Sequence, residues 1–146
     1  MISKKVFDIC LEKGITMAFA ESMTGGLLTY EMVKNPNASQ VVIGSVISYQ
    51  RYIKEQLLCV DSKIIDDYSI VSKEVSKQMA LGIFKQTQAD LCISITGNAG
   101  PTYEKNTEKL EAFITVLYQQ KYLDLHLDFT KQDREKNIKD SIDFIY

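Results

Sequence analysis

The first residues that could carry chemistry are a serine and two glycines at a turn. Ser22 lies two residues before Thr24, Gly25 and Gly26, where a short apolar run gives way to a helical pattern. Glycines at a helix start expose backbone N–H groups, and these groups together with the helix dipole attract anions or a developing oxyanion. Ser22 is therefore either a nucleophile or a serine that caps the helix. The segment leaves both interpretations open, because it contains neither a G-x-S-x-G nor a Walker A pattern.

A serine nucleophile needs a base, and the chain has one histidine. His126 stands between Leu125 and Leu127 on an expected strand, so we interpret it as a surface or packing residue and not as part of a triad. Lysine can replace histidine when its ammonium is desolvated. Lys54 follows Tyr49 by five residues, so both could reach one cleft. On residue types alone, the simpler interpretations are a solvated surface lysine and an aromatic residue at a rim.

A second polar glycine turn, Thr96–Pro101, follows a later apolar run. Gly97 and Gly100 permit positive φ angles and close backbone approach, so exposed N–H groups, the Thr96 hydroxyl and the Asn98 amide could hold a polar ligand. An ordinary loop is the alternative.

The apolar pattern predicts the elements that position these turns. We expect helices over 2–13, 27–33, 53–58, 72–86 and 133–144. We expect strands over 15–20, 41–49, 89–96, 113–118 and 122–129. Together they favour a three-layer α/β/α sandwich with a mixed, mostly parallel sheet and a C-terminal antiparallel hairpin. Ligands in such sheets bind beyond the carboxyl ends of the strands, which is where both glycine turns fall.

Length and composition exclude several classes of function. The chain has 146 residues, fitting one domain over 1–146, and its net charge of -2 gives no basic field for nucleic acid or a membrane surface. No run approaches the roughly 18 apolar residues of a membrane span. Cys10, Cys59 and Cys92 lie in apolar stretches and are expected to be buried free thiols of a cytoplasmic protein. One histidine and no C-x-x-C pair give no metal site of the usual His/Cys kind.

Five segments match, in order and spacing, the pattern of a known family: Glu21–Gly26, Ser48-Tyr49 with Lys54, Val71–Val75, Ala89–Leu91 and Thr96–Pro101. Over nearly the whole chain the sequence resembles the CinA C-terminal domain family. That family includes nicotinamide mononucleotide deamidases, which hydrolyse the nucleotide's carboxamide to nicotinic acid mononucleotide and ammonia without a metal or other cofactor. The resemblance implies a small-molecule nucleotide as the partner, and a homodimer.

The resemblance also implies roles for individual residues. Ser22 matches the family's nucleophile, with Met23 where the family has cysteine, and Tyr49 and Lys54 match the residues that activate it. Arg134 loosely matches an arginine that would meet the nucleotide phosphate. The implied substrate contacts are Glu21, Thr24, Gly25, Gly26, Thr96, Gly97, Asn98, Gly100 and Arg134.

Several positions depart from the family pattern. Thr102–Lys105 replaces a run of glycines, Ala112–Ile114 replaces a G-T-V element, and Ile138-Lys139 stands near where a second arginine is expected. The N-terminal domain of larger members has no counterpart here, so we expect its activity to be absent. These departures keep two alternatives open: a catalytically degenerate member that binds a nucleotide or a protein, and a hydrolase for a different amide.

Overall fold

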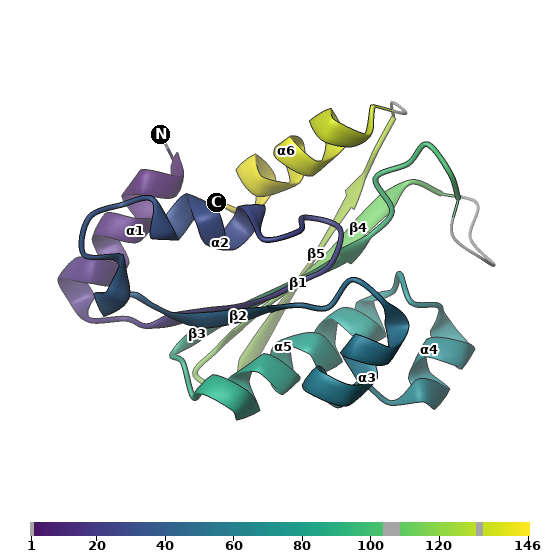
Figure 1. The fold of residues 1–146 in the computed structure, drawn as a ribbon, viewed down its shortest axis with the longest axis horizontal. Helices are drawn as coiled ribbons and strands as arrows, with labels where there is room; N and C mark the ends of the chain where they lie inside the picture. The colour runs from purple at the N-terminus through teal and green to yellow at the C-terminus, as the bar shows by residue number, and fades with distance from the viewer. Residues whose placement is uncertain (1, 104–108, 131–132) are drawn as a thin grey trace.

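The computed structural model describes residues 2–103, 109–130 and 133–146 and has three layers (Figure 1). The middle layer is a five-stranded sheet in the order β2-β1-β3-β4-β5. Its strands are β1 (Met17–Glu21), β2 (Val42–Ile47), β3 (Leu91–Gly97), β4 (Glu111–Tyr118) and β5 (Lys121–Asp128). One face carries α1 (Ile2–Lys13), α2 (Leu27–Val33) and α6 (Arg134–Ile145), and the other carries α3 (Arg51–Leu58), α4 (Ser62–Tyr68) and α5 (Lys73–Thr87). A short 3₁₀ helix spans Ala38–Gln40.

The sheet is mixed, as the sequence predicts. β1 pairs in parallel with β2 and β3, whereas β4 pairs antiparallel with β3 and β5. The hairpin turn is tighter than the three residues expected, because Tyr118 pairs with Lys121 across Gln119 and Gln120. Both glutamines have positive φ angles, 51° and 65°, which the mirror-image two-residue hairpin turns require.

The central strand β1 is buried on both faces of the sheet. Phe19 packs with Leu28 and Met32 of α2, while Ala18 and Ala20 pack toward α3 and α5. A strand that is buried on both sides holds its carboxyl end in a fixed place. Ser22 follows directly after that end.

Several sequence predictions need correction. The sequence predicts no helix over 62–68, where the structure has α4. Asp61 caps this helix by accepting a hydrogen bond from the Lys63 N–H at 2.8 Å. Cys59 is exposed and not buried, because it forms the C-cap of α3 with a φ of 56°. Cys10 and Cys92 are buried as predicted, and burial raises the pKa of Cys92 to about 11.

Two further expectations concern the altered loop and the membrane. Residues 104 and 105 of the loop that replaces the family's glycines lie outside the described residues. In the described part of the chain, no helix combines the length and apolar character needed to cross a membrane.

Candidate active site

A pocket of about 380 Å³ lies beyond the carboxyl ends of β1, β2 and β3. Its lining residues are Ser22, Met23, Tyr49, Gln50, Arg51, Ile70, Gly97, Asn98 and Arg134. The residues of both glycine turns and of the last helix therefore meet at one pocket, as expected for ligand sites at the carboxyl ends of parallel strands. Thr96 does not line it, and neither does Lys54, which lies behind Ser22.

A larger pocket, of about 440 Å³, lies at the opposite end of the strands, where β3 begins. It is formed by the end of α5 and the hairpin turn, with Phe84, Gln88, Leu117 and Tyr122 among its lining residues. None of the lining residues matches a candidate from the sequence. We therefore place the candidate active site in the smaller, more polar pocket.

Ser22 and Lys54 form a buried pair at the wall of this pocket. The Lys54 Nζ donates a hydrogen bond to Ser22 Oγ at 2.8 Å, and the lysine is only 1% exposed. It also donates to the carbonyl oxygens of Ser48 and, at 3.4 Å, of Tyr49. The interpretation of Lys54 as a solvated surface lysine is thus wrong: α3 begins at Arg51, two residues earlier than predicted, and turns this side chain back toward the strand ends.

Ser48 ties the ends of two strands together beneath this pair. Its N–H and hydroxyl both donate to the Glu21 carbonyl oxygen, at 2.7 and 3.1 Å. Ser48 therefore links the residue preceding Ser22 to the carbonyl that receives Lys54. The sequence contained Ser48 within a matching segment but gave it no role; a polar residue at the end of a predicted strand was the available signal.

The Glu21 carboxylate caps helix α2 from within the protein. One oxygen accepts hydrogen bonds from the Thr24 hydroxyl at 2.6 Å and from the N–H groups of Gly26 and Leu28 at 3.1 and 3.0 Å. The other accepts from the N–H of Thr29 at 2.9 Å and from its hydroxyl. Glu21 is fully buried, so this anion takes the position at the helix start that an external anion would occupy.

The first glycine turn consequently differs from expectation. The Gly26 N–H is bonded to Glu21, and the Gly25 N–H donates to the Ser22 carbonyl at 3.1 Å. These two N–H groups are used inside the chain, which contradicts their expected availability to an oxyanion. Ser22 is not the helix cap either, since the N-cap residue is Gly26 and the Ser22 hydroxyl contacts Lys54.

The second glycine turn is held by neutral groups. The Thr96 hydroxyl donates to the Ile70 carbonyl at 2.8 Å and is buried. The Asn98 amide donates to the Thr102 carbonyl at 2.7 Å, and its oxygen accepts from the Gly100 N–H at 2.9 Å. The polar groups that the sequence assigns to a ligand therefore shape the loop.

Close packing between the two turns requires glycine at position 97. A Cβ atom there would lie 2.5 Å from the Met23 sulfur and 2.7 Å from the Glu111 carbonyl oxygen. The residue after the candidate nucleophile thus packs directly on the second turn.

Arg134 and Tyr49 lie together at the pocket rim. The guanidinium donates to the Gly100 carbonyl at 2.7 Å and to the Tyr49 hydroxyl at 2.9 Å. Tyr49 is 56% exposed, in line with an aromatic residue at a rim. Arg51 also borders the pocket, but Asp66 and Glu55 pair with it at 2.8 and 3.4 Å, and the bond to Asp66 raises its pKa.

A mixed five-stranded sheet between two helical layers defines an α/β protein, and at the carboxyl ends of its parallel strands Ser22 of a polar pocket contacts the buried Lys54. The chain belongs to the CinA C-terminal domain family, whose model matches residues 1–145.

Curated relatives agree with this assignment. The chain is 40% identical to a CinA-like protein of Petrotoga mobilis over 97 residues, which is 66% of this chain and 24% of the relative. It is 35% identical to a CinA-like protein of Thermotoga neapolitana over 125 residues, 86% of this chain and 31% of the relative. The chain thus spans about a quarter to a third of the length of these relatives.

Solved structures share the fold. The competence damage-inducible protein A of Klebsiella pneumoniae superposes with a TM-score of 0.92 at 20% identity, covering 97% of this chain and 88% of that one. The competence/damage inducible protein CihA of Agrobacterium tumefaciens gives a TM-score of 0.90 at 20% identity, covering 96% and 86%.

Proposed function

We propose that this chain hydrolyses the carboxamide of nicotinamide mononucleotide to nicotinic acid mononucleotide and ammonia. The observation that carries the proposal is the 2.8 Å contact between Lys54 Nζ and Ser22 Oγ, both buried at the wall of a polar pocket. A hydroxyl and an amine within hydrogen-bond distance are the minimum apparatus of a serine–lysine amidohydrolase. Membership of a family that includes amidases supports the same chemistry.

The reaction would proceed in two halves. Lys54 first loses the proton that it donates to Ser22, so that its neutral amine can accept from the Ser22 hydroxyl across the same 2.8 Å contact. Ser22 Oγ then attacks the carboxamide carbon while its proton passes to this amine, and the C–N bond breaks. Lys54 returns the proton to the departing nitrogen, which leaves as ammonia, and an ester to Ser22 remains. Water then attacks the ester with Lys54 again taking a proton, and the acid and free Ser22 are released.

The pocket rim supports a substrate that carries a negative charge. In the described residues, Arg134 has no acidic partner, and two of its N–H groups bond to neutral oxygens. A guanidinium offers five N–H donors in a planar fork, so several remain for a phosphate. The proposal gives Tyr49 a place at this rim, because its hydroxyl faces Arg134, and leaves proton transfer to Lys54.

The test is ammonia release from nicotinamide mononucleotide by the purified chain. We expect steady release, its loss in Ser22→Ala, and an unchanged rate in the control Ser45→Ala, which alters an exposed serine of β2. Unchanged turnover in Ser22→Ala would remove this serine from the mechanism.

A second candidate function is nucleotide binding without catalysis. The specific observation in its favour is that the N–H groups of Gly25 and Gly26 donate hydrogen bonds within the chain. The first turn therefore offers fewer donors to an oxyanion than the sequence predicts. Calorimetric binding of the nucleotide without ammonia release would favour this candidate. Absence of both, with ammonia released from another carboxamide, would favour a hydrolase for a different amide.

A further inference from the structure

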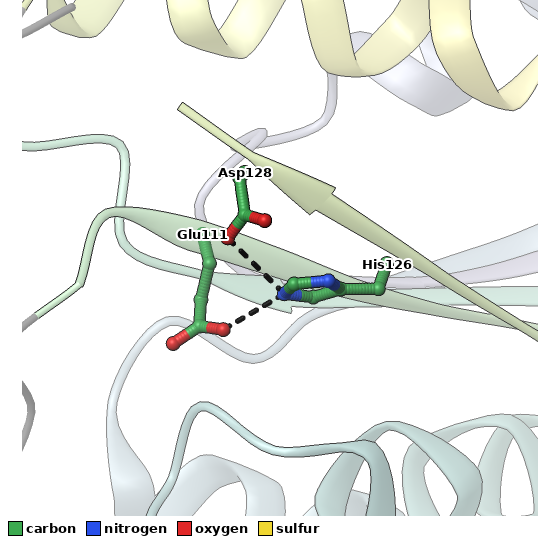
Figure 2. Close-up of side chains that lie close together, drawn as sticks. All are labelled: Glu111, His126 and Asp128. Carbon is green, nitrogen blue, oxygen red and sulfur yellow. Dashed lines mark hydrogen bonds and ion pairs between the residues drawn. The ribbon is translucent and has the colours of Figure 1, made fainter. Parts of the chain in front are cut away.

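A cluster of three potential metal ligands lies outside the active-site pocket, on the hairpin (Figure 2). Glu111 of β4 pairs directly across the ladder with Asp128 of β5, and His126 lies two residues before Asp128 on the same face. The His126 Nε2 lies 2.8 Å from a Glu111 oxygen and 3.5 Å from an Asp128 oxygen. One ligand atom from each residue lies within 4.8 Å of the other two.

The charges of this cluster favour a cation. Carboxylates directly opposite one another on neighbouring strands repel. Further along the same face of β5, Asp124 has the ammonium of Lys77 at 3.3 Å. In the part of the chain that the structure describes, Glu111 and Asp128 have no lysine or arginine within ion-pair distance and share only His126. A neutral imidazole donates one proton to one carboxylate, whereas a metal ion between the three would be bound by all of them.

The scaffold restricts the ligands and leaves access for an ion. The imidazole packs against the ring of Phe113, with centroids 4.7 Å apart, which limits its orientation. The His126 and Asp128 side chains are 40% and 61% exposed, so an ion can enter from solvent and keep water in its remaining positions. One imidazole nitrogen with two carboxylate oxygens suits zinc and neighbouring first-row ions better than Mg²⁺ or Ca²⁺, which prefer oxygen alone.

We propose that Glu111, His126 and Asp128 bind one divalent transition-metal ion of the zinc type. The proposal stands on these three side chains and does not depend on the proposed hydrolase function. The site is also connected to the pocket through the backbone, because the Glu111 carbonyl accepts a hydrogen bond from the Asn98 N–H at 2.8 Å. Bound metal would therefore stiffen the hairpin end against which the second glycine turn rests.

The test is calorimetric titration of the chelator-treated chain with Zn²⁺ and, separately, Mg²⁺. We expect one equivalent of Zn²⁺ to bind with a dissociation constant below about 1 mM, no comparable binding of Mg²⁺, and a rise in the thermal unfolding midpoint with Zn²⁺. His126→Gln and Asp128→Asn should each weaken binding about 10-fold or more. Addition of Co²⁺ should give a visible absorption band that is lost in His126→Gln.

Two controls separate this site from other sources of zinc binding. Asp124→Asn removes a carboxylate of the same strand face that lies outside the cluster, and should leave the affinity unchanged. Cys59→Ser removes the exposed thiol, the other strong zinc ligand on the surface, and should also leave it unchanged. Each variant's unfolding midpoint without metal reports whether it folds, and Glu111→Gln provides an independent third ligand variant. Binding that survives His126→Gln or disappears in Cys59→Ser, or no Zn²⁺ binding at all, would overturn the proposal.

Discussion

The two glycine turns at the pocket satisfy their polar groups in opposite ways. After β1, the buried carboxylate of Glu21 accepts five hydrogen bonds and occupies the start of α2. After β3, neutral carbonyl and amide groups hold the loop, and the cation Arg134 reaches it from α6. The turn that most resembles an anion site in the sequence therefore already contains an anion.

This difference assigns the two turns different roles in the proposed reaction. The first turn has its Gly25 and Gly26 N–H groups bonded inside the chain, which suits it to hold Ser22 against Lys54. The second turn lies beside the guanidinium of Arg134, which has further N–H donors beyond the two bonded to neutral oxygens. This arrangement suits the second turn to receive the negative group of a substrate. Variants that affect one turn but not the other can test this division.

The largest expected effect comes from Lys54→Met, which keeps the length of the side chain but removes the amine. We expect turnover to fall by about 10²-fold or more, because the general base is lost. Lys63→Met is the control, since that side chain is 80% exposed on α4 and should leave the rate unchanged. Ammonia release measures both, and circular dichroism shows whether the variants fold. A normal rate in folded Lys54→Met would make this lysine a bystander.

Glu21→Gln should act on stability. The amide keeps one acceptor oxygen but directs an NH₂ group at N–H and hydroxyl donors, and it removes the negative charge at the helix start. We expect the free energy of unfolding to fall by about 2–3 kcal/mol, measured by urea denaturation. A change within experimental error would mean that the carboxylate does not stabilise the first turn.

The sequence predicted the architecture because apolar periodicity and glycine turns are local signals. It predicted that a ligand pocket would lie at the carboxyl ends of the strands, because parallel strands with helical crossovers place these ends together. Residue types alone left the role of Glu21 open, and they predicted a surface position for Lys54, which is wrong because a charged residue is buried only when other segments supply its partners. For Lys54 these are Ser22 and Ser48, contributed by two other stretches of chain.

The sequence also missed the exposure of Cys59 and the cluster around His126, again because both depend on how the chain folds and not on local residue types. Cys59 lies in an apolar stretch, yet the backbone ends a helix there and turns the side chain to solvent. The carboxylates around His126 come together only through the register of β4 and β5, which residue spacing does not reveal. In the structure Lys54 contacts Ser22, whereas the Tyr49 hydroxyl contacts Arg134. The catalytic roles that the family resemblance implies for these residues stay predictions.

Arg134→Met tests the second turn. We expect KM for the mononucleotide to rise about 10-fold with a much smaller change in kcat, since a hydrogen bond to a charged group contributes about 1.5–3 kcal/mol. The dephosphorylated nucleoside should show no such rise, because it lacks the group that Arg134 would meet. Lys136→Met, which alters an exposed cation of the same helix, is the control. An equal loss for both substrates would mean that Arg134 only holds the loop.

The smallest effect should come from Glu31→Gln, the counterpart of Glu21→Gln within helix α2. Glu31 bonds to Lys34 at 2.7 Å and to the Ser3 hydroxyl at 3.0 Å, and these contacts, led by Lys34, lower its pKa. A lowered pKa stabilises the fold above the ordinary value of 4.5, and this contribution is lost as the pH falls through the pKa of the folded state. We therefore expect a loss of about 0.5 kcal/mol at neutral pH, shrinking to nothing in acid, measured by urea denaturation at both. A loss as large as that of Glu21→Gln would show that the two carboxylates contribute alike, and that burial at the helix start does not set Glu21 apart.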